Sequence, residues 1–144
     1  MNGASIKVYS RAKDGLKQVS ENFKVREFAC SDGSDAVFIS EELVEILQYV
    51  RKWAKAPVTI NSGYRTATFN KQCGGSTYSQ HLYGLAADIK VSGKTTAQVA
   101  AYLEAIMPKK GGIGLYKTFT HVDVRADRTR WDSTSGKEIA VSGF

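Results

Sequence analysis

The sequence predicts an α+β domain in which helices flank a small antiparallel sheet. Two segments repeat apolar residues at the spacing of a helix face, and several short segments have the composition of strands. These helices and strands do not alternate strictly, and their short connections favour antiparallel pairing. With 144 residues, 42% of them hydrophobic and 24% charged, the chain has the length and composition of one globular domain. We therefore expect a single domain over residues 1–144.

Two amphipathic helices are expected, over residues 41–55 and about residues 96–107. Ser40 is suited to cap the first helix, because its hydroxyl can accept a hydrogen bond from the first turn. Basic residues occupy the last turn of this helix, and Pro57 prevents it from continuing. The apolar faces consist of Leu43, Ile46, Leu47 and Val50 in the first helix and Val99, Tyr102, Leu103 and Ile106 in the second. Such stripes indicate core packing rather than a binding site.

The expected strands lie at residues 58–60, 86–91, 112–116 and 120–124. The last two are expected to form a hairpin around Lys117 and Thr118. Between the first two, Thr66 is suited to cap a short helix that Gly74 and Gly75 end. His81 then falls in a loop that leads into the strand at residues 86–91.

The chain is basic, with 20 Lys and Arg against 14 Asp and Glu and a net charge of +6. A basic protein attracts polyanions, and nucleic acid and an anionic bacterial wall are both candidates. The basic residues are scattered and show no aromatic-and-basic signature of a nucleic-acid module, so no nucleic-acid partner is expected. The densest basic group consists of Arg125, Arg128 and Arg130.

The sequence also bears on the compartment. No apolar run is long enough to span a membrane, and the first seven residues lack the apolar stretch of an export signal. The chain is therefore expected to be synthesised in a cytoplasm without a signal peptide and to have no membrane partner. Cys30 and Cys73 lie far apart without the CxxC spacing of a metal site, so two free, reduced thiols are expected.

The chain has two histidines, and both lie near carboxylates in the sequence. Zinc is commonly bound by two imidazoles and one carboxylate, which leaves a fourth position open for water. Asp88 falls on the expected strand that follows the loop of His81, and His121 falls on a neighbouring strand. From residue types alone, a zinc site and a pair of ordinary surface or core histidines both remain open, since 14 acidic residues allow many arrangements.

The spacing of these residues forms two motifs. The first is Ser79-x-His81-x-x-Gly84-x-Ala86-x-Asp88, and the second is an apolar residue followed, two positions later, by His121-Val-Asp123. The pattern resembles the D-alanyl-D-alanine carboxypeptidase family of zinc peptidases, which share a fold with lysostaphin-type enzymes and the hedgehog signalling domain. An upstream Ser-Gly-Tyr-Arg-Thr at residues 62–66 and Asn70 resemble the family too, so the resemblance covers roughly residues 58–125. Residues 22–30 are similar to the openings of such domains in bacteriophage lysins.

The resemblance implies that His81, Asp88 and His121 hold one Zn²⁺ ion. It also implies that Arg65 faces the carbonyl or the terminal carboxylate of a substrate. A guanidinium suits this role, because it is permanently charged and can bind a carboxylate with two hydrogen bonds. The expected substrate-binding residues are Arg65, Ser79, Gln80 and Tyr116, although local hydrogen bonding explains the last three equally well.

Asp123 is the candidate for a catalytic carboxylate. Because side chains at positions i and i+2 of a strand share a face, Asp123 should lie beside His121, while Val122 and Val124 point into the core. Asp123 could accept a proton from the attacking water, or it could accept the second ring N–H of a ligand histidine. Both roles remain open. The positions that hold the general base in related subgroups are here Thr118 and Phe119.

The implied function is zinc-dependent hydrolysis of stem or cross-bridge peptides in bacterial peptidoglycan, by a monomer. Carboxypeptidase and endopeptidase activity both fit, because Arg65 is compatible with a terminal carboxylate and with an open groove. The basic charge and the lack of an export signal fit a phage or prophage lysin that acts on the cell wall. The alternatives are a non-catalytic zinc-binding wall module on the same fold and a basic nucleic-acid binder with incidental histidines.

Overall fold

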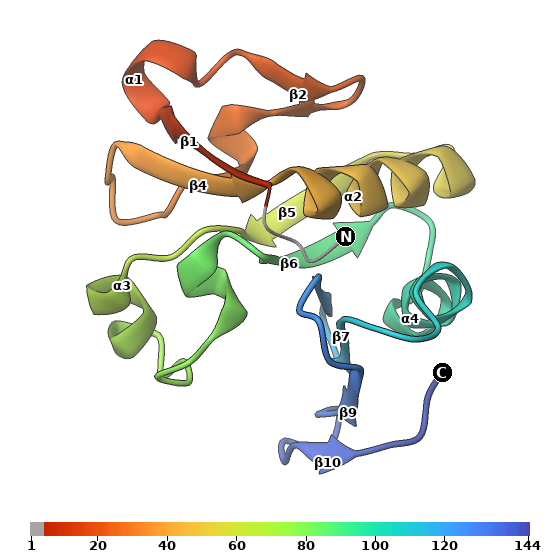
Figure 1. The fold of residues 1–144 in the computed structure, drawn as a ribbon. Helices are drawn as coiled ribbons and strands as arrows, with labels where there is room; N and C mark the ends of the chain where they lie inside the picture. The colour runs from red at the N-terminus through yellow and green to blue at the C-terminus, as the bar shows by residue number, and fades with distance from the viewer. Residues whose placement is uncertain (1–4) are drawn as a thin grey trace.

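The computed structural model describes residues 5–144; the first four residues, part of the segment considered for an export signal, lie outside it. It contains helices and strands in an α+β arrangement, as predicted (Figure 1). The helices are α1 (Arg11–Asp14), α2 (Glu41–Ala54), α3 (Ala67–Gln72) and α4 (Thr96–Ile106), with 3-10 turns η1 (Val25–Phe28) and η2 (Gln80–Tyr83). The strands are β1 (Ile6–Ser10), β2 (Gln18–Ser20), β3 (Phe23–Lys24), β4 (Ala36–Ser40), β5 (Val58–Ser62), β6 (Ala86–Val91), β7 (Gly112–Leu115), β8 (Thr120–Asp123), β9 (Thr129–Asp132) and β10 (Ile139–Ala140).

A six-stranded sheet in the order β10-β9-β7-β8-β6-β5 forms the centre of the molecule. The four strands from β5 to β7 pair antiparallel, and the expected hairpin of β7 and β8 is confirmed. One pairing departs from the expectation of an antiparallel sheet, because β9 runs parallel to β7. The chain leaves β8, passes β7 and adds β9 on its far side. The backbone N–H of Ser133 then donates to the carbonyl of Leu115 at 2.8 Å.

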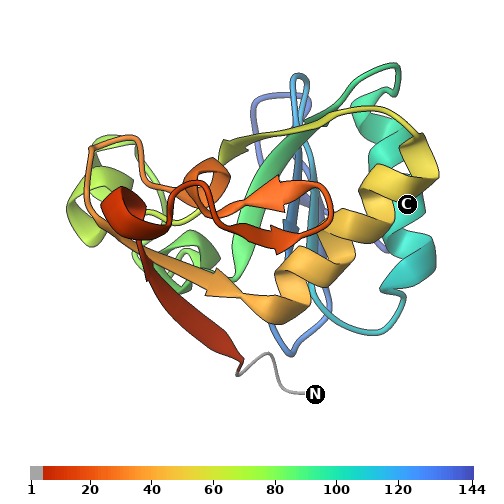
Figure 2. The same ribbon diagram turned by 90° about the horizontal axis from the view of Figure 1, so that it is seen from above.

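Helices α2 and α4 pack on one face of this sheet and contact each other (Figures 1 and 2). The predicted cap is present, since the Ser40 hydroxyl accepts a hydrogen bond from the N–H of Leu43. Trp53 of α2 stacks on Tyr102 of α4, with ring centroids 4.4 Å apart. The predicted apolar stripes form the core, where Leu47 is fully buried together with other residues of both helices.

Side-chain alternation along the strands separates this core from the opposite face of the sheet. Ile89 of β6 and Val122 of β8 are fully buried in the core cluster with the helices. Their neighbours Asp88 and His121 therefore point to the other face, which α2 and α4 do not cover. Helix α3 and the turn η2, which follow β5 in the chain, lie close to this face (Figure 1).

The N-terminal part adds a layer that the sequence did not predict. Here β1 pairs with β4 and β2 pairs with β3, with α1 and η1 between them. Val37 and Ile39 of β4 join the core, whereas β1 contributes no fully buried residue.

Two further expectations concern the whole chain. Within residues 5–144, no helix combines the length and the apolar character needed to cross a membrane. Both cysteines are free thiols, with Cys30 buried and Cys73 exposed.

Candidate metal centre

His81 lies in η2, a 3-10 turn where the sequence predicted a loop. The Ser79 hydroxyl caps this turn by accepting a hydrogen bond from the N–H of His81. Gly84 ends the turn with φ of +73°, and a Cβ there would lie 2.4 Å from the carbonyl oxygen of Phe38, so only glycine fits. The Nδ1 atom of His81 lies 2.7 Å from the carbonyl oxygen of Gly63. An Nδ1–H that donates to this carbonyl leaves the lone pair of Nε2 available to a metal.

Asp88 and His121 face each other across neighbouring strands, because Asp88 of β6 is paired in register with His121 of β8. One carboxylate oxygen of Asp88 lies 2.9 Å from Nδ1 of His121, and the other lies 3.4 Å from Nε2 of His81. Two ligand atoms of a tetrahedral zinc site are about 3.3 Å apart, given zinc–ligand bonds of about 2.0–2.1 Å. The candidate ligand atoms all lie within 4.8 Å of one another, so this buried group could hold a metal ion.

Asp123 lies beside His121, as the strand alternation predicts, and Val122 and Val124 are buried in the core. Its Oδ2 atom is 2.8 Å from Nε2 of His121, so it can accept the ring N–H and leave Nδ1 directed at Asp88. Arg125 donates from Nε and Nη2 to the two oxygens of Asp123 at 2.8 and 2.7 Å. The side chain of Asp123 is 0% exposed, so its carboxylate reaches no solvent.

The charged side chains of this group shift one another's pKa values. Burial alone would raise the pKa of Asp88, but hydrogen bonds and charge from His121 and His81 outweigh it and hold that pKa well below the ordinary value. The pKa of Asp123 is likewise held low against burial by His121 and Arg125. Burial would lower the pKa of His121, but its hydrogen bonds to Asp123 and Asp88 raise it to about 9. Both carboxylates are therefore ionised at neutral pH, which a cation site requires.

Arg65 contacts the same group from the segment between β5 and α3. It donates to Ser62 Oγ at 2.9 Å, to Asn70 Oδ1 at 3.1 Å and to Asp88 Oδ2 at 3.3 Å. Asn70 is buried, and its own amide donates to the carbonyl of Ser76, which ties the segment after α3 to Arg65. Arg65 is therefore fixed next to a candidate ligand.

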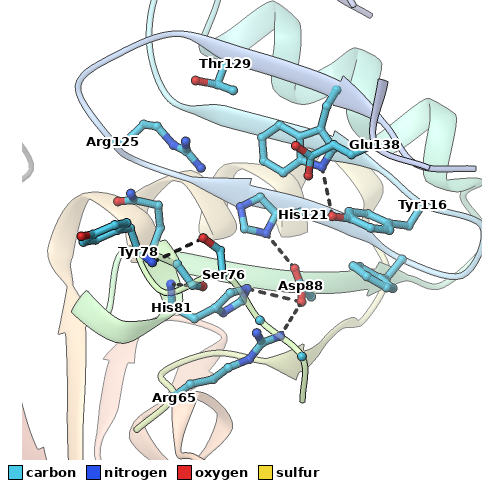
Figure 3. Close-up of a pocket in the computed structure, with 16 residues that line it drawn as sticks. Arg65, Ser76, Tyr78, His81, Asp88, Tyr116, His121, Arg125, Thr129 and Glu138 are labelled. Atoms are coloured by element: carbon cyan, nitrogen blue, oxygen red, sulfur yellow. Dashed lines mark hydrogen bonds and ion pairs between the residues drawn. The ribbon is translucent and has the colours of Figure 1, made fainter. Parts of the chain in front are cut away.

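A cavity of about 400 Å³ opens over these residues (Figure 3). Seven of the eight residues expected at the site line it, and Asp123 does not. Several other lining residues were not expected from the sequence. The expected lining residues are Arg65, Ser79, Gln80, His81, Asp88, Tyr116 and His121; the additional ones include Ser76, Tyr78, Arg125, Thr129, Trp131 and Glu138. Of these six residues, only Arg125 belonged to a group that the sequence analysis named.

Trp131 of β9 forms one wall of the cavity. Its ring centroid lies 5.0 Å from that of His121, and its indole N–H donates to the hydroxyl of Tyr116 at 3.0 Å. The indole lies directly on Gly114, where a Cβ would come within 2.4–2.6 Å of three ring atoms. Tyr116 stacks on Phe119 at 4.3 Å between centroids, which extends the aromatic wall.

Two imidazoles and one carboxylate that converge beneath an open cavity are the ligand set of a mononuclear zinc hydrolase. The chain belongs to the peptidase M15 family, whose model matches residues 18–123 and so includes all three candidate ligands. A stretch of 33 residues is 48% identical to the zinc D-Ala-D-Ala carboxypeptidase of Streptomyces albus G. This stretch covers 23% of the chain but only 13% of that relative's length. The predicted family is thereby confirmed, and the resemblance to phage lysins stays a prediction.

Proposed function

We propose that this chain is a zinc-dependent peptidase that hydrolyses peptide bonds of bacterial peptidoglycan. The observation that carries the proposal is the convergence of His81, Asp88 and His121 beneath an open cavity that Arg65 also lines. Membership of the peptidase M15 family and the similarity to a zinc D-Ala-D-Ala carboxypeptidase support the same reaction. When bound, zinc would supply Lewis-acid chemistry, polarising the scissile carbonyl and making the attacking water more acidic.

The role we assign to Asp123 is to orient His121. Of the two roles open from the sequence, the geometry favours this one. A group that takes a proton from water must reach the cavity, whereas the Asp123 carboxylate is fully buried and does not line it. Its oxygens are already engaged by Arg125, by His121 and by the backbone N–H of Gly112. Such a carboxylate fixes the tautomer and the direction of a ligand imidazole.

Arg65 is the residue we assign to the substrate carbonyl or carboxylate. Three of the five N–H groups of its guanidinium donate to Ser62, Asn70 and Asp88, which leaves two for a ligand in the cavity. Its side chain is 16% exposed, so the remaining donors are largely shielded from solvent. Shielding strengthens charge-assisted hydrogen bonds to a substrate. Gln80, Ser79 and Tyr116 complete the proposed substrate contacts from the cavity wall.

A non-catalytic zinc module is the alternative on the same fold. Structural zinc sites are usually closed by four protein ligands, whereas catalytic sites keep one position open. Within residues 5–144, the candidate group supplies three ligands and opens into the cavity. These features favour the enzyme. As its setting we propose a monomer that acts on the wall as a lysin, and the net charge of +6 fits an anionic wall.

The proposal is tested by digesting purified peptidoglycan and analysing the released fragments by mass spectrometry. New amino and carboxyl ends should appear within stem or cross-bridge peptides, without new reducing sugar ends. Loss of a terminal D-alanine alone would identify a carboxypeptidase, and an internal cut would identify an endopeptidase. The double variant His81→Ala, His121→Ala is the matched control and should release nothing. Only reducing ends, or only stems with a free L-alanine amino group, would contradict the proposal.

A further inference from the structure

The cavity contains a carboxylate that neither sequence motif includes. Among the described residues that line it, the carboxylates are Asp88 and Glu138. Asp88 is committed to the two candidate ligand histidines and to Arg65. Hydrolysis of an amide needs a group that accepts a proton from the attacking water and gives one to the leaving amine. Glu138 is the carboxylate in the cavity that is free of the candidate ligand group.

The turn between β9 and β10 carries Glu138. Asp132 braces the start of this turn, because its Oδ1 accepts from the N–H and the hydroxyl of Thr134 at 2.8 and 2.7 Å. Gly136, with φ of +91°, reverses the chain. In the β9–β10 ladder Ala140 is paired with Trp131. Glu138 comes directly before β10, and it lines the cavity together with Trp131.

Trp131 links this turn to the candidate ligands, since its ring packs beside His121 and on Gly114. Figure 3 shows Glu138 and Arg65 on opposite sides of His121. Arg125 is a further neighbour. The pKa of Arg125 is raised mainly by its hydrogen bonds to Asp123, and the charge of Glu138 adds to this effect. A substrate in the cavity would therefore lie between Arg65 and Glu138.

We propose that Glu138 is the catalytic carboxylate of the proposed peptidase, an inference that rests on that function. One oxygen of Glu138 takes a proton from the water as the water oxygen bonds to the scissile carbonyl carbon. The same carboxyl then gives this proton to the amide nitrogen as the C–N bond breaks. The products are a carboxylic acid and an amine, and Glu138 returns to its starting state. The family match ends at residue 123, so this residue is supplied by the segment beyond it.

The test compares Glu138→Gln with Lys137→Gln, an exposed neighbour in the same turn. Glutamine keeps the size and polarity of Glu138 but cannot take up the proton. Glu138→Gln should lower kcat by about a hundredfold or more with KM little changed. The control should keep wild-type turnover. Both variants should keep one zinc per chain and the wild-type melting temperature, because Glu138 is exposed and is not a candidate ligand.

Two further measurements separate proton transfer from a structural or binding role. Formate should restore turnover in Glu138→Ala, because a small carboxylate can occupy the vacated space, and it should not stimulate the wild type. Calorimetric binding of a muropeptide to the zinc-free protein, where no turnover occurs, should be the same for the wild type and Glu138→Gln.

The outcomes are distinguishable. An active wild type with an equally active Glu138→Gln would overturn this inference and leave the proposed function standing. Parallel losses in muropeptide binding and in kcat/KM, with kcat unchanged, would show that Glu138 binds substrate and would overturn it as well. A wild type that holds zinc but cleaves no peptide bond in peptidoglycan would overturn the proposed function and this inference together.

Discussion

Replacement of Asp123 by asparagine separates the two roles that a carboxylate next to a ligand histidine can play. In the structure, Oδ1 of Asp123 accepts from the N–H groups of Gly112 and Arg125, and Oδ2 accepts from His121. Asparagine can keep the oxygen that serves the two backbone donors. Its NH₂ group then faces Nε2 of His121, where a donor meets a donor. His121 can relieve this conflict only by moving its proton to Nδ1, the atom that would bind the metal.

The size of the effect follows from these contacts. Loss of a carboxylate that orients a ligand histidine typically costs ten- to a hundredfold in metal affinity, or about 1.4–2.8 kcal/mol. Asp123→Asn also removes one partner of a buried ion pair, a change that costs about 3–5 kcal/mol. We expect the lower end, about 3 kcal/mol, because the side chain of Arg125 is 28% exposed and can be solvated. For a chain of this size, that loss lowers Tm by roughly 6–12 °C.

The assay is competition for zinc against a chelator of known affinity, together with thermal unfolding of the metal-free protein. Arg125→Gln is the matched control, because it breaks the same ion pair but leaves Asp123 to accept the proton of His121. We expect both variants to lose stability and only Asp123→Asn to lose metal affinity. An Asp123→Asn variant with wild-type zinc affinity and about a hundredfold lower kcat would refute the orienting role and make Asp123 the base.

Three other predictions follow from the described contacts. Gly114→Ala should cost about 1–3 kcal/mol in the free energy of unfolding, because its Cβ would overlap Trp131, and adding Trp131→Leu should recover part of this loss; equal unfolding of Gly114→Ala and the wild type would contradict it. Because the pKa of Asp88 is lower in the folded protein than its ordinary 3.8, its contribution to the stability of the metal-free protein is present above pH 3.8 and is lost as the pH falls through the folded-state value. Acid titration followed by circular dichroism checks this, and an Asp88→Asn variant with the same acid sensitivity as the wild type would disprove it. Without denaturant, a thiol reagent should label Cys73 rapidly and Cys30 only slowly, with reductant leaving Tm unchanged; two protected cysteines that reductant exposes would indicate a disulfide.

The elements with strong local signals were predictable from the sequence. The helix expected over residues 41–55 is α2, because the Ser40 cap and the apolar stripe act within one element. The strand expected at residues 86–91 has the same bounds in the structure. The candidate ligands were predictable for another reason, since their residue types and spacing reflect the chemistry of a metal site rather than a folding preference.

Elements that depend on distant contacts were not predictable. Strand β1 has only a short apolar alternation at Ile6 and Val8, and both side chains are exposed rather than packed in the core. Its pairing with β4 therefore defines it. For β9 to pair parallel with β7, the chain must pass β7 after it leaves β8, and no local sequence pattern predicts this path. The position of Glu138 over the cavity depends on this pairing. The sequence alone therefore did not predict a functional role for this exposed glutamate.

The cluster of basic residues shows how tertiary contacts change the meaning of a sequence feature. Arg125 pairs with Asp123, and Arg128 and Arg130 both pair with Glu104. Arg130 also donates to the carbonyl of Gly111, and its side chain is fully buried. The densest basic group of the sequence is therefore largely neutralised by acidic partners.

Zinc analysis of the purified chain tests the central claim most directly. His81, Asp88 and His121 leave no redundancy, because three ligands with one open position is the minimum for a catalytic zinc site. Elemental analysis after dialysis against metal-free buffer should find one zinc per wild-type chain, lost to a strong chelator. The double variant His81→Ala, His121→Ala should retain none while still folding. Stoichiometric zinc in that double variant would show that the metal binds elsewhere and would contradict the account.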